Sequence, residues 1–446
     1  MPLAHELGIA HLRNAYSPRD VQVLLVSRFV RLAGFGAFAP VLILFLKSLG
    51  IPDERIGLFL SATLAGDVLV SLIVTWTADT IGRRRMIALG SALMAMSGLA
   101  FYYSSNFVVL LLAAIFGIIS PTGNETGPFS ALEQAALSQL TSQDGRVYVL
   151  MWHQVLGFFG ISAGNVLTGF IVSMGEKLGK SPQEAYRRVF LAYAGIGALK
   201  VLLSLIMTRA VEVDHPPFPT QEPTSAPADS ERQPLLQGER FVAPAAPSSP
   251  TVPTPPARLP LGRLVALCLI FGLDAFASSL APLSFISYYF RSEFSAPVSL
   301  ITRIFSITAL IGCVSQLAAG PISKRLGIIL TMVGTHMPAQ LLTIALAFAP
   351  NLATALTIFI ARACINTMDA SVRGAFLAAV IPKESRTRFL GIINICKTLA
   401  ATPGPTLSLG LTALGGMCWS FVITGCIKLL YDVALFIGFK TAKLEH

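Results

Sequence analysis

Charged residues are scarce in this sequence. Only 13% of its 446 residues are Asp, Glu, Lys or Arg, and 54% are hydrophobic, whereas soluble domains carry about 25% charged residues. This scarcity excludes an ordinary soluble protein and indicates a chain that lies mostly in a membrane. The net charge of +10 does not indicate nucleic acid binding, because the basic residues are spread over short loops and form no single patch.

Several signatures of enzymatic and metal sites are missing as well. The first half of the chain has no cysteine, and the six cysteines of the second half show no metal-ligand spacing. The sequence also has neither a phosphate-binding loop nor a nucleophile elbow. We therefore expect no disulfide framework, no metal, no cofactor and no enzymatic activity.

Long apolar runs are abundant instead. A membrane-spanning helix needs about 20 apolar residues. Twelve runs qualify as spans: 22–47, 56–76, 86–104, 107–139, 147–174, 188–208, 262–290, 299–320, 327–348, 353–381, 389–413 and 417–439. The sequence therefore predicts an all-α polytopic membrane protein with twelve transmembrane helices.

The spans fall into two sets of six. We expect an N-terminal bundle at 22–209 and a C-terminal bundle at 261–439, joined by a disordered linker at 210–260 that is rich in Pro, Ser, Thr and Ala. With the ends 1–21 and 440–446 inside, the inner segments hold 18 Lys and Arg residues and the outer loops 7. Positive charge is retained on the cytoplasmic side, so we expect both ends and the linker there.

A charged turn follows the second span. Residues 75–85 read Thr-Trp-Thr-Ala-Asp-Thr-Ile-Gly-Arg-Arg-Arg, so that Asp79 and Gly82 precede Arg83 and Arg84. Glycine allows a sharp turn, and the arginines do not enter hydrocarbon cheaply. The turn is therefore expected at the cytoplasmic surface.

A weaker copy of this turn follows the eighth span, with Gly320, Arg325 and Gly327 in the sequence Gly-Pro-Ile-Ser-Lys-Arg-Leu-Gly. Two halves of six spans, each with such a turn, resemble the major facilitator superfamily of secondary transporters. The first turn matches the family's G-x-x-x-D-x-x-G-R-R pattern except for Thr75 at the leading glycine, and the second has Lys324 at the acidic position. The resemblance implies that the first turn helps to hold the cytoplasmic gate closed in the outward-facing state.

A second repeat supports the first. Residues 142–146 and 383–386 both resemble the family's P-E-x-R turn, and they align at an offset of 240 residues. At the same offset Glu133 in the fourth span falls opposite Arg373 in the tenth. Residues 123–129 and 368–373 resemble a fungal and bacterial branch of the superfamily.

Ionisable residues inside the spans are the candidate site. Each costs a few kcal/mol at membrane depth, so each needs a structural or functional reason. The resemblance implies that the first, fourth, seventh and tenth spans line a central cavity at the interface of the halves. The candidates for binding solute or protons are Arg31, Asp67, Glu133, Asp274, Asp369 and Arg373.

The alternative is that these charges only neutralise one another. Residues four apart on a helix face the same way. The structural pairs predicted on this basis are Asp369 with Arg373 and Lys428 with Asp432. A further predicted pair is a bridge between spans, from Arg28 or Arg31 of the first span to Asp67 of the second.

A proton carrier must be a group that can lose its charge. Asp274 is surrounded in its own span by Gly, Ala, Ser, Leu and Phe, so it is the preferred carrier, with Asp67 and Glu133 as alternatives. His153 and His336 are expected to be packed and hydrogen-bonded rather than proton relays.

The sequence thus predicts a monomeric secondary transporter that moves a small solute through the lipid bilayer by alternating access, driven by a proton gradient. Apart from Lys47, Arg188 and Arg263 at their ends, which are counted with the loops, the spans hold 8 basic and 6 acidic residues. This favours an anionic solute because guanidinium binds carboxylate and phosphate well. The alternatives are a non-transporting sensor or receptor with the same fold, or a drug-type proton antiporter.

One short motif bears on localisation. Glu231, Leu235 and Leu236 in Glu-Arg-Gln-Pro-Leu-Leu resemble the acidic dileucine signal that sorting adaptors read on lysosomal and vacuolar membrane proteins. The motif predicts a sorting adaptor as partner and a vacuolar or lysosomal membrane as destination, with the plasma membrane as the alternative.

Overall fold

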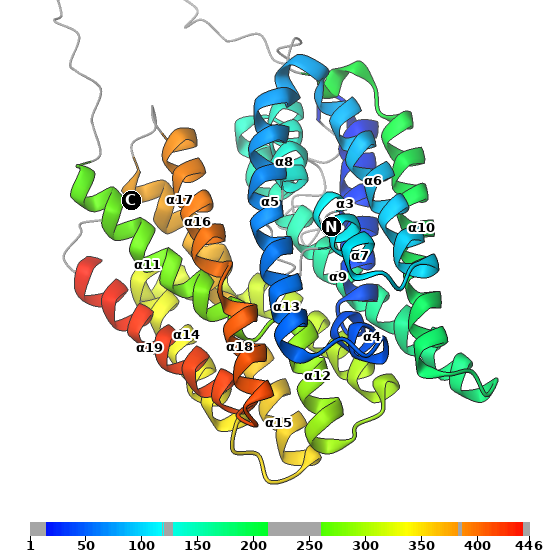
Figure 1. Ribbon diagram of the computed structural model, residues 1–446. Helices are drawn as coiled ribbons and strands as arrows, with labels where there is room; N and C mark the ends of the chain where they lie inside the picture. Colours follow the sequence, from blue (N-terminus) through cyan, green and yellow to red (C-terminus); the bar gives the residue numbers. More distant parts are fainter. Residues whose placement is uncertain (1–14, 118, 120–127, 213–259, 382–385, 440–446) are drawn as a thin grey trace, which may run out of the picture.

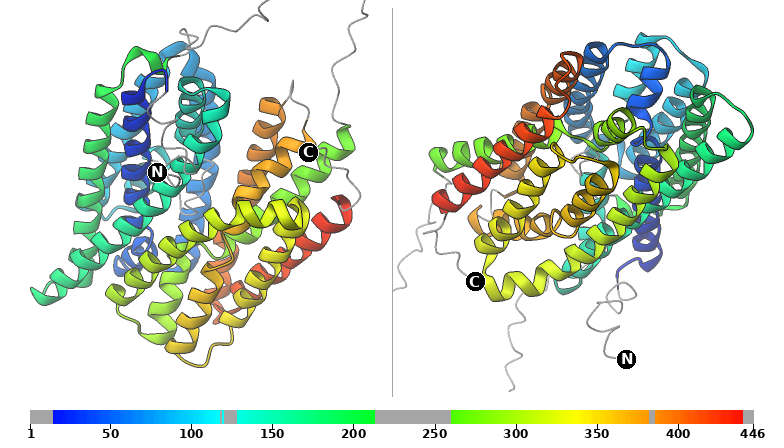
Figure 2. Two further views of the ribbon diagram at one scale, coloured as in Figure 1. Left: turned by 180° about the vertical axis from the view of Figure 1, so that it is seen from behind. Right: turned by 90° about the horizontal axis from the view of Figure 1, so that it is seen from below.

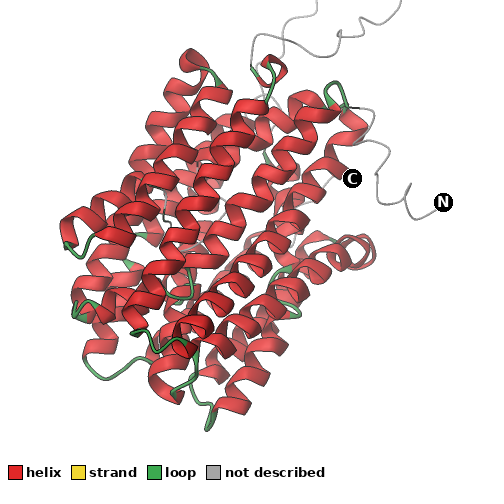
Figure 3. Ribbon diagram, turned by 90° about the vertical axis from the view of Figure 1, so that its right-hand side faces the viewer, coloured by secondary structure: helices red, strands yellow, loops and turns green. Residues whose placement is uncertain are grey.

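A computed structural model describes residues 15–117, 119, 128–212, 260–381 and 386–439. These residues form helices joined by loops, with no strand among them (Figure 3). The helices of the N-terminal half are α3 (Pro18–Phe38), α4 (Leu42–Ser48), α5 (Asp53–Ile81), α6 (Arg83–Tyr103), α7 (Phe107–Phe116), α8 (Pro128–Leu140), α9 (Gln143–Lys177) and α10 (Pro182–Ile206). The helices of the C-terminal half are α11 (Leu261–Leu280), α12 (Leu283–Phe294), α13 (Val298–Leu326), α14 (Ile328–Leu346), α15 (Leu352–Ala363), α16 (Met368–Val380), α17 (Arg386–Ala401), α18 (Gly404–Ala413) and α19 (Trp419–Phe439).

Each of the twelve predicted spans coincides with one long helix or with two shorter helices in succession. In the described part of the chain, nine helical segments are long and apolar enough to cross a membrane. The other three predicted spans are the fourth, tenth and eleventh, which are divided into α7 and α8, α15 and α16, and α17 and α18. The all-α fold is thus confirmed, and a length criterion misses three spans because their helices are interrupted.

Five of the predicted spans are divided into two helices, and a proline lies at three of these divisions. Pro40 lies between α3 and α4, Pro282 between α11 and α12, and Pro403 between α17 and α18, and proline removes a backbone donor and clashes with the preceding turn. The break between α15 and α16 has no proline. There the Ser315 hydroxyl donates to the Cys364 carbonyl at 2.6 Å, which satisfies a backbone acceptor that the broken helix leaves free.

The helices form two bundles that follow the order of the sequence (Figures 1 and 2). Within the N-terminal bundle, α9 packs closely on α3. A side chain at Gly164 of α9 would meet the backbone of Ala33 and Ala37 on α3, so glycine is needed for this approach.

The two bundles contact each other at one end. One apolar cluster contains Phe45 and Phe190 of the N-terminal bundle together with Phe290 and Phe359 of the C-terminal bundle. Two further clusters each belong to a single bundle, and the N-terminal one of these lies beside the charged turn at Gly82. The bundles therefore share a core at the end remote from the charged turn, which is the lower end in Figure 1.

Polar contacts between the bundles accompany this shared core. The hydroxyl groups of Ser162 on α9 and Ser306 on α13 are 2.6 Å apart, and Thr406 on α18 donates to Ser61 on α5 at 2.7 Å. These contacts join α9 to α13 and α5 to α18, the two most extensive helix contacts between the bundles; α5 also packs on α17, and α4 on α12.

The predicted linker at 210–260 lies outside the described residues except at its two ends. Residues 209–211 form a short 3-10 turn after α10, so the N-terminal bundle extends slightly into the segment assigned to the linker. The sorting motif at Glu231, Leu235 and Leu236 and the family-like segment 123–127 also lie outside the described residues.

Candidate functional site

Glu133 is the centre of a charge cluster inside the N-terminal bundle. Its side chain on α8 is fully buried. Its Oε2 atom accepts a hydrogen bond from Arg31 Nη2 of α3 at 3.1 Å, and its Oε1 atom accepts one from Lys200 Nζ of α10 at 3.1 Å. His153 Nε2 of α9 lies 3.5 Å from Oε2. Basic groups from three helices therefore meet at one carboxylate.

The predicted pairing of Asp67 with Arg28 or Arg31 is wrong. The buried Arg28 guanidinium donates to Ser130 Oγ at 3.2 Å and to Gln154 Oε1 at 3.1 Å, and Arg31 is bonded to Glu133. Asp67 Oδ1 is buried and accepts no hydrogen bond from the residues described. Helices α8 and α9 supply the partners of these two arginines instead, and the sequence alone does not show which helices pack against α3.

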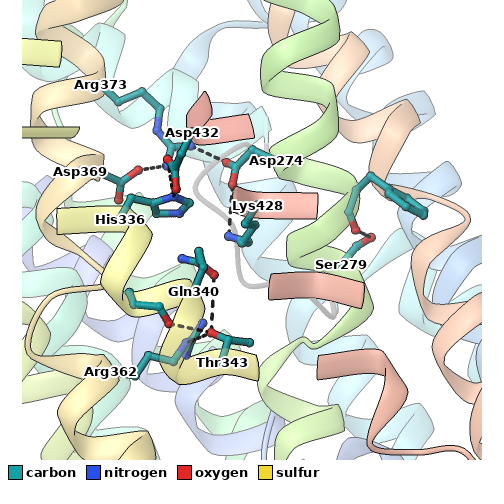
Figure 4. A network of polar contacts seen from close by, with 12 residues as sticks. Asp274, Ser279, His336, Gln340, Thr343, Arg362, Asp369, Arg373, Lys428 and Asp432 are labelled. Carbon is teal, nitrogen blue, oxygen red and sulfur yellow. Dashed lines mark hydrogen bonds and ion pairs between the residues drawn. The ribbon is translucent and has the colours of Figure 1, made fainter. Parts of the chain in front are cut away.

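Asp274 is the corresponding centre in the C-terminal bundle. Its Oδ2 atom accepts a hydrogen bond from Arg373 Nη1 of α16 at 2.9 Å, and its Oδ1 atom lies 3.1 Å from Lys428 Nζ of α19. Arg373 is also paired with Asp369, one turn earlier on α16. Figure 4 shows the Arg373 guanidinium between the two aspartates and Lys428 beside Asp274.

Two sequence predictions about this cluster have opposite outcomes. The pair of Asp369 and Arg373 is confirmed, whereas the pair of Lys428 and Asp432 is wrong. Lys428 pairs with Asp274, and the Asp432 carboxylate lies 2.9 Å from His336 Nδ1, within hydrogen-bond distance. Both residues do face the same way on α19, but α11 and α14 pack against that face and offer closer partners.

The structure also changes the description of Asp274 as isolated. Asp274 has no charged neighbour within its own helix, yet two cations from other helices contact its two carboxylate oxygens. His336 is packed between Asp432 and the Tyr431 ring, whose centroid is 5.6 Å from the imidazole centroid. This agrees with its expected structural role.

The charged turn after α5 is bound to its own bundle. Gly82 has φ +98° and precedes α6, a conformation that favours glycine. The Arg83 backbone N–H donates to Glu212 Oε2 at 2.7 Å, and the Arg83 side chain donates to Gln139 Oε1 at 2.6 Å. Arg84 donates to the carbonyl oxygen at the end of α10 at 2.9 Å. The turn thereby connects the ends of α5, α8 and α10.

Glu212 contacts this turn from the segment after α10, and nothing in the sequence indicated that contact. It lies in the segment assigned to the linker, where composition gives no sign of an ordered contact. The side chains of Asp79 and Lys324, which distinguish the two copies of the turn, lie outside what the structure describes.

The second copy repeats the backbone of the first. Gly327 has φ +85° and precedes α14, as Gly82 precedes α6, and Arg325 beside it is exposed. Gly320 lies seven positions earlier, within α13. The repeat deduced from the sequence is therefore also a repeat of turn geometry.

Comparison with known proteins assigns the chain to a protein family. The model described as "Major Facilitator Superfamily" matches residues 24–372. The chain belongs to the Major Facilitator Superfamily. The resemblance seen in the charged turns is thereby confirmed, and the superfamily fold implies twelve transmembrane helices in two bundles.

Three similar proteins illustrate its place in the Major Facilitator Superfamily. The uncharacterized membrane protein YJR124C of Saccharomyces cerevisiae is 31% identical over 425 residues, which cover 94% of this chain and 93% of that protein. The quinolone resistance protein NorA of Staphylococcus aureus is 25% identical over 261 residues, covering 58% of this chain and 56% of NorA. A bacterial homologue of the human lysosomal transporter Spinster, in an inward-facing and occupied conformation, has a TM-score of 0.69 at 14% identity and covers 94% of this chain and 96% of its own. This last likeness shows the fold alone.

The two positive-φ glycines allow a matched test of the charged turn. Alanine at either position costs on the order of 1–3 kcal/mol through backbone strain. At Gly82 the added Cβ would also lie 2.9 Å from Glu212 Oε2, whereas at Gly327 it would meet nothing within 4 Å. We expect Gly82→Ala to lower the Tm of the purified protein more than Gly327→Ala. Equal decreases would contradict an ordered contact between the turn and Glu212.

Proposed function

We propose that this chain is a secondary active transporter that moves a small solute across a membrane by alternating access. The proposal rests on one observation above all: each bundle holds an ion cluster in its interior, on spans that the superfamily fold places at the interface of the halves. Ionisable groups at membrane depth are expensive, and they mark solute and ion pathways.

The contacts between the bundles support an inward-facing state. The bundles share an apolar cluster and the Ser162 to Ser306 contact at the end remote from the charged turn. The positive-inside rule assigns the charged turn to the cytoplasm, so the closed end is the outer one. Alternating access then requires α9 to separate from α13 and α5 from α18 in each cycle.

The contact between α9 and α13 provides a test of alternating access. A Ser162→Cys/Ser306→Cys variant, in a background whose six native cysteines are replaced by serine, should form a disulfide on oxidation because the two hydroxyl groups are 2.6 Å apart. We expect oxidation to stop solute uptake into proteoliposomes and reduction to restore it. Each single cysteine variant serves as the control and should be insensitive to oxidant. Full uptake by the cross-linked protein would contradict an opening between these helices.

For proton coupling we propose Asp67 in place of the carrier that the sequence favours. Protonation of Asp274 would have to break ion pairs with two cations, Arg373 and Lys428. The buried Asp67 Oδ1 accepts no hydrogen bond from the described residues, so it can take up and release a proton without first breaking one there. Glu133, with three basic groups around it, is as poorly suited as Asp274.

Uptake measurements test this proposal and transport together. We suggest a panel of labelled sugars, nucleosides, carboxylates and organic phosphates in proteoliposomes, with and without a pH gradient. We expect a gradient to increase uptake by the wild-type protein at least several-fold and to have no effect on Asp67→Asn, which should retain exchange. Glu184→Gln removes an exposed carboxylate and should behave like the wild type. Unchanged gradient dependence in Asp67→Asn would exclude this residue as the carrier.

A drug-type proton antiporter is the second candidate, and the similarity to NorA over 58% of the chain favours it. Expression in a quinolone-sensitive host discriminates between the two, because an antiporter of that type should raise resistance and a solute importer should not. A receptor with the same fold would bind a member of the uptake panel and give no flux.

We propose the vacuolar or lysosomal membrane as the location, with the plasma membrane as the alternative. The support is the dileucine motif in the segment between the bundles. Replacement of Leu235 and Leu236 by alanine should move a fluorescently tagged protein from that membrane to the cell surface, as seen by microscopy. The matched control is Leu261→Ala, an exposed leucine at the start of α11. An unchanged location of the double variant would refute the signal.

A further inference from the structure

The two ion clusters are built on the same plan with the charges exchanged. In the N-terminal bundle the first span carries Arg31 and the fourth carries Glu133; in the C-terminal bundle the corresponding spans carry Asp274 and Arg373. The sixth span of each bundle then contributes a lysine to the carboxylate. We call these sets the N triad (Arg31, Glu133 and Lys200) and the C triad (Arg373, Asp274 and Lys428).

Each carboxylate contacts its two cations through different oxygens. Glu133 uses Oε2 for Arg31 and Oε1 for Lys200, and Asp274 uses Oδ2 for Arg373 and Oδ1 for Lys428. A buried charge that loses its partner is strongly destabilising. Because the lysine contact is separate, the arginine can leave the carboxylate without leaving a buried charge unpaired.

The arginine is the accessible member of each triad. The side chains of Arg31 and Arg373 are 17% and 20% exposed, whereas those of Glu133 and Asp274 are 0% and 5% exposed. A guanidinium is not stable against lipid, so its exposed part faces the space between the bundles. A solute there would contact arginine before it contacts the carboxylate or the lysine.

Each arginine also has a spare donor. The Nε atoms of Arg31 and Arg373 are buried and have no hydrogen-bond partner among the residues described. Guanidinium binds carboxylate and phosphate through two parallel N–H donors. In Arg31, Nε and the Nη2 atom that Glu133 would release form such a parallel donor pair. In Arg373, Asp274 would release Nη1, while the Nη2 atom beside Nε stays with Asp369, so this arginine offers an anion single donors.

We propose that the site takes an anionic solute with a carboxylate or phosphate group, which displaces Glu133 from Arg31 and Asp274 from Arg373. Lys200 and Lys428 are positioning residues that keep the displaced carboxylates neutralised. This inference rests on the proposed transporter function and names the class of its solute. The N triad is the stronger anion site, because Asp369 holds Arg373 as a second carboxylate.

Displacement predicts effects of opposite sign within one triad. Glu133→Gln removes the internal competitor for Arg31, so anion affinity should rise. Lys200→Met leaves Glu133 with Arg31 as its remaining hydrogen-bonded cation, so anion affinity should fall, and Lys200→Arg should restore it. A purely structural role for the triad would lower affinity in both Glu133→Gln and Lys200→Met.

The experiment is the ligand-dependent Tm of the purified full-length protein at constant ionic strength. The probes are succinate and glycerol 3-phosphate, each compared with its uncharged counterpart, dimethyl succinate or glycerol. We expect stabilisation by at least one of the two anions and by neither neutral compound. The half-saturating anion concentration should be about tenfold lower for Glu133→Gln and about tenfold higher for Lys200→Met, within the usual range of coupling between two sites.

The chain contains a matched control for these variants. Lys180, Glu184 and Arg188 form a triad of the same composition on the surface, with both cations within 3.1 Å of the Glu184 carboxylate. Glu184→Gln and Lys180→Met should leave the half-saturating concentration unchanged. A change as large as that of the buried variants would overturn the proposal.

Further outcomes separate this inference from the proposed function. If Glu133→Gln does not fold, Asp274→Asn and Lys428→Met test the C triad, with smaller changes of the same signs because Asp369 remains on Arg373. Stabilisation by neither anion overturns the inference, even if a neutral solute is transported. Stabilisation by anions without flux of any solute supports the inference and refutes the transporter. The increase in Tm with succinate, compared with the increase with glycerol 3-phosphate, shows whether the site prefers a carboxylate or a phosphate group.

Discussion

The pairing of buried charge inside each bundle is the interaction on which the rest of the structure depends. Glu133 connects α3, α8 and α10, and Asp274 connects α11, α16 and α19. Each carboxylate is buried and thus ties the first, fourth and sixth spans of its bundle together in a medium of low dielectric constant. Such internal ties allow a bundle to move as one body, which a rocking motion requires.

The interrupted spans belong to the same arrangement. The first, fourth, seventh and tenth spans are divided into α3 and α4, α7 and α8, α11 and α12, and α15 and α16, and these spans carry the arginines and carboxylates of the triads. Interrupted helices are tolerated in a membrane when protein groups satisfy the freed backbone, as Ser315 does for Cys364. The arginines and carboxylates of the triads therefore lie on interrupted spans, while the triad lysines lie on the uninterrupted helices α10 and α19.

The sequence predicted the fold well because span length and apolar composition are local properties. It predicted the repeat through Gly82 and Gly327, whose backbone conformations agree. It could not predict the partner of Lys428, because a spacing of four identifies neighbours on one helix and says nothing of the helix packed against it. Glu212 escaped notice for a similar reason, since its contact with the charged turn depends on where α10 ends relative to α6.

The core shared by the two bundles has an energetic consequence for the resting protein. That core is apolar, with Phe45 and Phe290 among its members, and only a few polar contacts accompany it. In the proposed alternating-access cycle, opening this end would expose the apolar surface to water, so the hydrophobic effect favours the closed contact seen here. Hydrophobic association weakens on cooling, so in such a cycle the form that is open at this end would gain population in the cold.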